Sequence, residues 1–452
     1  MITTDLIIIG AGPGGYETAL AAAKRGKKVT LFEGADLGGT CLNAGCIPTK
    51  CLCRNAEVLS QFKEADAFGI DNFTFEFDFA KAMSRKNQVV STLRDGIKAM
   101  LQQAKVEVIQ EYAYFKDASI VVAGDEEYTA ENIIIATGSV SKSLPIPGAD
   151  MECVRNSTQM LNIEYVPASL TIVGGGVIGM EFASIFASMG SKVTVIEYCK
   201  QILPPFDSDI AKRLKQNLAK KGIEIITSAA VKKIEQNSDY EITTTYECKG
   251  KELSVTTTDI LMAVGRAPRL DKLNLEAAGV EFSPRGIVVD DFMRTNVPNI
   301  YAIGDVNARM MLAHVATYQG LRALNAIDSK EDNIDFSIVP SAVFTQPECG
   351  MVGLTSDQCK AQGMEVRIGQ SFFRANGKAL TLGEPDGLCK LIFKADDMTL
   401  VGAHIMGVQA ADLAQQCADL MSRHASLSDI TETIFSHPTV SEVILQACHN
   451  IK

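Results

Sequence analysis

The sequence predicts an α/β fold with two similar parallel-sheet units, in a chain that should divide into about three domains. Two observations support this prediction. One pattern of strand, glycine-rich turn, helix and strand occurs twice, and a chain of 452 residues is too long for a single hydrophobic core. The composition, with 46% apolar and 21% charged residues, is that of ordinary globular domains.

The first copy of the pattern begins near the N-terminus. Residues 6–9 predict a buried strand and residues 29–32 a second one, which ends at Glu33. Between them lies a turn whose glycines have G-x-G-x-x-G spacing: Gly10, Gly12 and Gly15. Such a turn lets a pyrophosphate approach the positive end of the next helix, and the carboxylate of Glu33 can accept hydrogen bonds from a ribose.

The second copy repeats every part of the first. Strands at residues 170–173 and 193–196 enclose a helical stretch, and Glu197 ends the second strand. The glycines of this turn are Gly174, Gly176 and Gly179. Both copies place the acidic residue 23 positions after the first glycine. One such motif is weak evidence, but two in full context indicate that the chain binds two adenine dinucleotides.

The acidic residue of the second copy also selects its nucleotide. Glu197 would repel a 2′-phosphate, and no arginine follows it closely. The second site is therefore expected to bind NAD rather than NADP, a preference that the nearby Lys200 could weaken.

A pair of cysteines lies between the first nucleotide motif and the next long helix. Cys41 and Cys46 are five residues apart, which on a regular helix places them about 7.5 Å apart along the axis and about 140° apart around it. Disulfides usually join Cα atoms about 4.4–6.8 Å apart. A bond here therefore requires a distorted turn, which Gly45 and Pro48 can provide. Such a strained disulfide is easily reduced and suits catalysis.

Spacing alone leaves three interpretations of these cysteines open. The pair can be redox-active, it can be two buried thiols of the kind common in globular proteins, or it can join Cys51 and Cys53 in a zinc site. Zinc sites usually contain C-x₂₋₄-C pairs. The spacings here, C-x₄-C, C-x₄-C and C-x-C with no histidine nearby, fit that pattern poorly, so a metal is the least favoured of the three interpretations.

Charge and composition exclude several partners. A net charge of −11 would repel nucleic acids and anionic membranes, and no run of about 20 apolar residues could span a bilayer. The first strand begins within a few residues of Met1, which leaves no room for a signal or transit peptide. We expect a cytoplasmic protein, although a transit peptide removed earlier would leave the same sequence.

The segment around the cysteines resembles the redox-active motif of the flavoprotein pyridine nucleotide-disulfide oxidoreductases. It reads GGTCLNAGCIPTK at residues 38–50. Further segments resemble marks of this family in the same order along the chain: IIIATG at 133–138, GRAP at 265–268, IYAIGD at 300–305 and HPTVSE at 437–442. The resemblance therefore covers the whole chain.

The resemblance implies FAD at the first glycine motif and NAD at the second. Further cofactor-binding residues implied by it are Thr137, Gly138, Gly265, Asp305 and Ala313, with Asp305 on the ribityl chain. Lys50 and Glu181 resemble the ion pair beside the flavin, where a positive charge stabilises the reduced ring. An ordinary salt bridge between two helices is the alternative for this pair. Arg269 departs from the family pattern, in which asparagine is common at this position.

The resemblance also assigns the catalytic residues. In this family the first cysteine, here Cys41, exchanges with the substrate, and the second, here Cys46, faces the flavin. His437 would accept the thiol proton, with Glu442 holding its other ring nitrogen. Because this histidine faces the disulfide of the other subunit in the family, we expect an obligate homodimer.

The His-Pro segment also has a purely structural interpretation. Thr439 and Glu442 fit a capping box, with the threonine at the N-cap and the glutamate three residues later. One carboxylate could serve both purposes. The peptide bond before Pro438 is expected to be cis.

Within the family, the chain resembles the members that oxidise dihydrolipoamide with NAD⁺. Residues 311–314 (MLAH) and Glu197 carry this resemblance, while Phe435 replaces a second histidine that is frequent in such enzymes. The chain end has one thiol, Cys448, rather than the cysteine pair of mercuric or large thioredoxin reductases. The expected partner is a lipoyl-bearing protein of a 2-oxo-acid dehydrogenase complex or of the glycine-cleavage system. The alternatives are an NAD(P)H-dependent reductase of another small disulfide and a non-enzymatic redox-sensing or zinc-binding module.

The resemblance divides the chain into four segments. Residues 1–147 would form most of the FAD domain, 148–270 the NAD domain and 271–338 a return to the FAD side. Residues 339–452 would form an α+β dimerisation domain. The duplication supports the first two boundaries independently. Residues 339–344 predict a linker that enters an edge strand.

Overall fold

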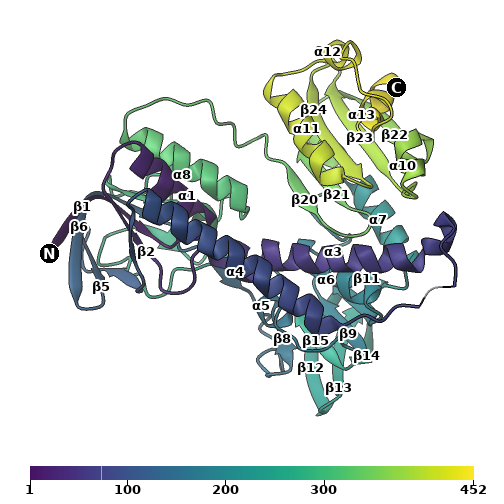
Figure 1. The fold of residues 1–452 in the computed structure, drawn as a ribbon, viewed down its shortest axis with the longest axis horizontal. Helices are drawn as coiled ribbons and strands as arrows, with labels where there is room; N and C mark the ends of the chain where they lie inside the picture. Colours follow the sequence, from purple (N-terminus) through teal and green to yellow (C-terminus); the bar gives the residue numbers. More distant parts are fainter. Residues whose placement is uncertain (73, 452) are drawn as a thin grey trace.

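A parallel sheet built on the N-terminal strand forms the first unit (Figure 1). The computed structural model describes residues 1–72 and 74–451. The parallel strands, in spatial order, are β3 (Glu107–Ile109), β2 (Val29–Phe32), β1 (Ile2–Ile9), β6 (Glu126–Ile135) and β19 (Ile300–Ala302). Strands β5 (Ile120–Ala123) and β4 (Ala113–Phe115) extend the sheet antiparallel from β6. The last four residues of β1 are buried, as expected for a parallel strand that is covered on both faces.

A second parallel sheet repeats this design. Its strands, in spatial order, are β11 (Glu224–Thr227), β10 (Lys192–Glu197), β9 (Ser169–Val173), β15 (Asp259–Met262) and β8 (Val154–Arg155). An antiparallel meander of β12 (Ala229–Ser238), β13 (Glu241–Cys248) and β14 (Lys251–Thr257) precedes β15, as β4 and β5 precede β6 in the first unit. The equivalent helices α1 (Pro13–Lys24) and α6 (Val177–Ser188) follow the two glycine turns. The internal duplication predicted from the motifs therefore extends to strand order.

The third unit is an antiparallel sheet. Its strands, in spatial order, are β20 (Ser341–Val343), β21 (Cys349–Gly353), β24 (Leu400–Met406), β23 (Leu388–Lys394) and β22 (Val366–Phe372). The helices α11 (Ala410–Ser422) and α13 (Glu442–His449) pack on it. The edge strand expected after residue 339 is β20. The shorter helices are α5 (Ser157–Met160), α9 (Ser356–Ala361), α10 (Gly377–Thr381) and α12 (Leu427–Thr431).

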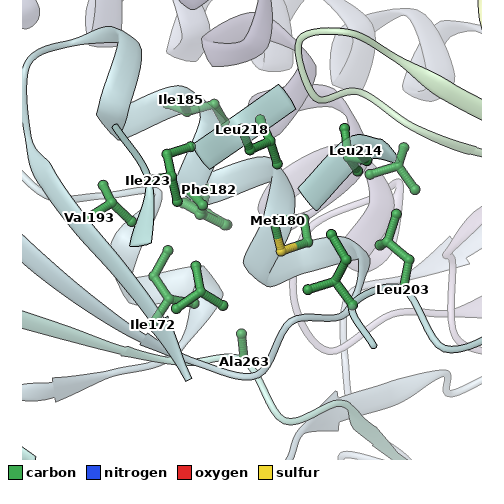
Figure 2. Close-up of a cluster of buried hydrophobic side chains, with 14 of the residues drawn as sticks. Ile172, Met180, Phe182, Ile185, Val193, Leu203, Leu214, Leu218, Ile223 and Ala263 are labelled. Atoms are coloured by element: carbon green, nitrogen blue, oxygen red, sulfur yellow. The ribbon is translucent and has the colours of Figure 1, made fainter. Parts of the chain in front are cut away.

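Two long helices connect the units: α3 (Cys46–Lys63) and α4 (Phe79–Gln103). Figure 2 shows Ile172 and Val193 of the second sheet packed with Phe182 of α6 in one apolar cluster. The same cluster includes Leu52 of α3 and Met406 of the third unit. The third unit is thus fixed to the second by a shared core. Among the described residues, no helix is long and apolar enough to cross a membrane.

A buried ion pair also joins the second and third units. The Nζ atom of Lys390, on β23, lies 2.8 Å from Oδ1 of Asp207 and 2.6 Å from Oδ2 of Asp209. Asp207 precedes α7 (Ser208–Lys220) and is fully buried, and Lys390 is 3% exposed. Burial by itself raises the pKa of Asp207, but hydrogen bonds from Lys390 and Ser356 lower it to about 2. The charged pair therefore persists at neutral pH.

We expect Lys390→Met to lower the free energy of unfolding by about 3–5 kcal/mol, because it leaves a buried carboxylate without its cation. The folded-state pKa of Asp207 is lowered, so its contribution is full above the unfolded pKa of about 3.9 and is lost as pH falls towards about 2. The difference in the free energy of unfolding between variant and wild type should therefore become smaller below about pH 4. Denaturant unfolding measures it, with Lys394→Met on the same strand as control. If Lys390→Met lowered the free energy of unfolding at neutral pH by no more than Lys394→Met does, the importance of this ion pair would be contradicted.

Candidate active site

The first glycine of each turn adopts a backbone conformation that other residues rarely reach. The φ angle is +103° at Gly10 and +109° at Gly174. A Cβ atom at Gly10 would lie 2.5 Å from the Ala136 carbonyl oxygen, and one at Gly174 would lie 2.4 Å from the Ala263 carbonyl oxygen. Glycine is therefore required here both for conformation and for space.

The other two glycines of each turn differ from each other in their surroundings. A Cβ atom at Gly15 or Gly179 would lie 1.8 or 1.9 Å from the carbonyl oxygen of the first glycine, so these residues allow the helix to pack on the turn. At Gly176 none of the described residues would come within 4 Å of such an atom, and at Gly12 the nearest would be 3.9 Å away. The second glycine thus faces open space, where a pyrophosphate can approach the backbone.

The acidic residues that end the second strands have a role that sequence reasoning missed. The Glu33 carboxylate accepts hydrogen bonds from the backbone N–H groups of Ala11, at 2.8 Å, and Ala35, at 2.9 Å. Glu197 accepts equivalent bonds from Gly175, at 2.5 Å, and Cys199, at 2.6 Å. Each carboxylate therefore holds its glycine turn in place. A carboxylate oxygen has further lone pairs, so both residues can still accept from a ribose.

One cavity of about 2920 Å³ connects both glycine turns with the cysteine pair. Ligand pockets usually enclose about 300–1,000 Å³, so this cavity has room for two dinucleotides. The predicted cofactor-binding residues that line it are Gly10, Gly12, Glu33, Lys50, Thr137, Gly138, Gly174, Gly176, Glu181, Glu197, Gly265, Asp305 and Ala313. Gly15 and Gly179 lie behind the turns, as their packing on the first glycines requires.

A backbone break separates the two cysteines of the pair. Cys41 lies in the short helix α2 (Gly39–Ala44), and Cys46 is the first residue of α3. Gly45 joins the helices with φ −148° and ψ −113°. The expected distortion is therefore present at Gly45. Pro48 lies in the first turn of α3, where proline is tolerated, and its part in the distortion stays a prediction.

The two thiols have opposite acidities. All twelve cysteines are free thiols in this structure, so the pair is described in its reduced form. A hydrogen bond from Cys41, together with the charge of Lys50, lowers the pKa of Cys46 to about 7, although burial opposes this. The same hydrogen bond and burial raise the pKa of Cys41. Cys46 is therefore the thiolate and Cys41 the thiol.

The expected pair of Lys50 and Glu181 lies directly beside this thiolate. The Nζ atom of Lys50 is 2.9 and 3.0 Å from the two carboxylate oxygens of Glu181 and 4.7 Å from the Phe344 ring centre. The backbone N–H of Phe344 donates to the same carboxylate at 2.9 Å. Burial alone lowers the pKa of Lys50, but Glu181 raises it above its usual value. A fixed positive charge therefore faces the cavity next to Cys46.

Asp305 has partners that the sequence did not suggest. Its carboxylate accepts a short hydrogen bond from the Ser139 hydroxyl, and Nε of Arg266 donates to that hydroxyl at 2.7 Å. Strands β7 (Ser139–Ser141) and β16 (Arg266–Pro268) pair here, so this network joins the two nucleotide units. The Thr137 hydroxyl donates to the Arg269 carbonyl oxygen at 2.9 Å in the same region. No short sequence motif contains these pairings, since their members are more than 120 positions apart.

His437 and Glu442 form the expected pair. The His437–Pro438 peptide bond is cis, and Nδ1 of His437 is 3.0 Å from Oε1 of Glu442. The backbone N–H of Thr439 donates to the other carboxylate oxygen at 2.9 Å, so one carboxylate serves both purposes. The hydrogen bond from the Thr439 backbone lowers the pKa of Glu442 the most, and the bond with His437 lowers it further. The expected N-cap at Thr439 is wrong, because α13 begins at Glu442 and the Thr439 hydroxyl donates to the Ser436 carbonyl oxygen instead.

Within one chain, His437 lies apart from the cysteines. His437 and Glu442 are not among the described residues that line the large cavity. The histidine side chain is 78% exposed. It precedes α13, which Figure 1 shows with α12 on the side of the third unit remote from α3, whose first residue is Cys46. A second chain must therefore supply the histidine if it acts on the cysteine pair.

Comparison with known proteins finds family matches along almost the whole chain. Residues 4–320 match the family model of the pyridine nucleotide-disulphide oxidoreductases, and residues 339–448 match the dimerisation domain of the same family. The chain belongs to this family. The family confirms the expected α/β fold and oxidoreductase class, with FAD and NAD as cofactors. The dimerisation domain supports a homodimer.

The chain is similar over its full length to several members of the family. It is 39% identical to a dihydrolipoyl dehydrogenase of Geobacillus stearothermophilus and 40% identical to one of Bacillus subtilis, and each match covers 99% of this chain and 96% of the relative. The solved structure of the HOCl-induced flavoprotein disulfide reductase RclA from Escherichia coli is 30% identical, with a TM-score of 0.88. That match covers 98% of this chain and 99% of RclA.

The cysteine acidities predict different spectra for two serine variants. Cys41→Ser should show a long-wavelength thiolate-to-flavin band without any reduction, and the band should grow with pH as Cys46 loses its proton beside Lys50. Cys46→Ser should show no such band even after two-electron reduction. Absorbance titration of the flavin-loaded variants tests this, with Cys153→Ser as control. Identical behaviour of the two variants would contradict the assignment.

Proposed function

We propose that the chain is a dihydrolipoamide dehydrogenase, which oxidises protein-bound dihydrolipoamide and reduces NAD⁺. The observation that carries this proposal is the Cys41–Cys46 pair, which lies in one cavity with two dinucleotide-binding turns. A thiolate beside a fixed lysine, with a nicotinamide site in the same cavity, suits electron transfer between a dithiol and NAD⁺. The full-length similarity to proteins named dihydrolipoyl dehydrogenase supports this choice of substrate.

The residues of the site divide the reaction between them. One thiolate of the substrate attacks Cys41 in the oxidised pair, which breaks the Cys41–Cys46 bond and leaves Cys46 as a thiolate. The second substrate thiolate then attacks the mixed disulfide, so lipoamide leaves and both cysteines are reduced. FAD, when bound, carries the two electrons from the cysteine pair to NAD⁺. Once the pair is reduced, the hydrogen bond from Cys41 and the Lys50 cation stabilise the Cys46 thiolate, and the lowered pKa of Cys46 supports this role.

The substrate thiols need a base, because only thiolates are nucleophilic. We assign this role to His437 of the second subunit. The bond from Nδ1 to Glu442 fixes the ring and leaves Nε2 free to accept a thiol proton. The exposed position of His437 in one chain, on the family's dimerisation domain, supports action across the dimer interface.

The natural substrate in this proposal is a lipoyl group on a carrier protein. A 2-oxo-acid dehydrogenase complex and the glycine-cleavage system both present such a group. We place the enzyme in the cytoplasm, where thiols remain reduced. We also propose domain boundaries at about residues 147, 270 and 338. With these boundaries, one parallel sheet belongs to the FAD side and the other to the NAD domain.

We expect His437→Gln to lower lipoamide turnover by about 10²–10⁴-fold, the usual contribution of a general base. Reduction of an artificial acceptor by NADH should persist, because it bypasses the thiols. Steady-state kinetics with both acceptors measure the two activities, and His449→Gln on α13 is the control. Equal loss of both activities would remove His437 from thiol chemistry.

The two-subunit site predicts complementation. Dimers of His437→Gln chains and dimers of Cys41→Ser chains should each have little activity with lipoamide, but a mixed dimer contains one intact site if the histidine acts in trans. Activity should therefore appear after subunit exchange. A mixture that stays at the level of its parents, with heterodimers verified by mass spectrometry, would refute the shared site.

A further inference from the structure

The helix that carries Cys41 has little stability of its own. Helix α2 is six residues long, and isolated helices of that length do not persist in water. Glycine occupies both capping positions, Gly38 and Gly45, and glycine has no side chain with which to cap a helix. The position of Cys41 therefore depends on contacts that other segments make with α2.

Asn43 makes the most extensive of these contacts. Its Nδ2 donates to the carbonyl oxygens of Leu37, at 3.0 Å, and Gly39, at 2.9 Å. These carbonyls lie just before α2 and in its first turn, so the amide ties the end of the helix back to its beginning. The Oδ1 atom of the same amide points to a different element and accepts hydrogen bonds from Arg94.

Arg94 anchors this amide to the long helix α4. Its Nε and Nη2 donate to Oδ1 of Asn43 at 3.1 and 2.7 Å, and its Nη1 is 3.0 Å from Oδ1 of Asp36. The Asp36 side chain is 58% exposed, so that ion pair contributes little. The two-pronged contact with Asn43 is the stronger, because a guanidinium fork holds its acceptor in a fixed direction. Asn43 lines the large cavity, whereas Arg94 is not among the described residues that do.

We propose that Arg94 is a positioning residue for thiol–disulfide exchange at Cys41 and acts through Asn43. This proposal rests on the proposed function. Cys46 begins an 18-residue helix and has its own fixed neighbours in Lys50 and Glu181. Cys41 depends on α2, which Arg94 anchors to α4. Loss of the anchor therefore disturbs attack at Cys41, while Cys46 keeps Lys50 beside it.

Misplacement of a reacting atom by about 1 Å can cost about 10²-fold in rate. We expect Arg94→Met to lower kcat with dihydrolipoamide by about tenfold or more, with KM within about twofold. The oxidised enzyme should also react more slowly with dithiothreitol by a similar factor. NADH reduction of an artificial acceptor should be unchanged, because it bypasses the thiols. Arg94→Lys should restore part of the rate, since one ammonium can still donate to Asn43, and Lys98→Met on α4 is the control.

A double-mutant cycle separates positioning from direct contact with the substrate. If Arg94 acts through Asn43, Arg94→Met should cause no further loss in an Asn43→Ala background. Equal losses in both backgrounds would show that Arg94 acts independently of Asn43 and would overturn the proposal, as would an unchanged dithiothreitol rate in Arg94→Met. An enzyme without dihydrolipoamide turnover would contradict the proposed function, while the dithiothreitol rates would still decide the role of Arg94.

Discussion

The break in the helix at Gly45 is the constraint on which the active site depends. A continuous helix would hold Cys41 and Cys46 too far apart to form a bond, and the break lets their thiols share a hydrogen bond. A Cβ atom at residue 45 would lie 2.9 Å from the Thr40 carbonyl oxygen, so glycine forms this turn without a shift of the neighbouring backbone. The lowered pKa of Cys46 and the dependence of Cys41 on tertiary anchors both follow from this one turn.

The duplicated sheets supply the frame around that turn. Each uses the same glycine conformation and a carboxylate bound to the backbone of the turn to shape a nucleotide site. The pairing of β7 with β16 and the Ser139–Arg266–Asp305 network join the two frames. A shared core and the Lys390–Asp207 pair fix the third unit to the second. Contacts between segments that are remote in sequence therefore fix the positions of the units around the cavity.

The sequence was sufficient for features that local patterns encode. The glycine turns, their acidic partners and the cysteine pair have fixed spacings, and each spacing has a physical reason. Contacts between distant segments could not be read in this way. Arg94 lies 51 positions from Asn43, and nothing in either neighbourhood points to the other. The N-cap expected at Thr439 failed for a related reason. The pattern fits a helix start, but the Thr439 hydroxyl donates to the Ser436 carbonyl oxygen and the Glu442 carboxylate also binds His437.

The most direct test of the account is an anaerobic titration of the oxidised, flavin-loaded enzyme with dihydrolipoamide, followed by absorbance. The account predicts that a stoichiometric amount of dithiol produces a long-wavelength thiolate-to-flavin band while the main flavin absorbance is largely retained. Addition of NAD⁺ should then remove the band and produce NADH. Bleaching of the flavin without the band, or no reaction with the dithiol, would contradict the central role of Cys41 and Cys46.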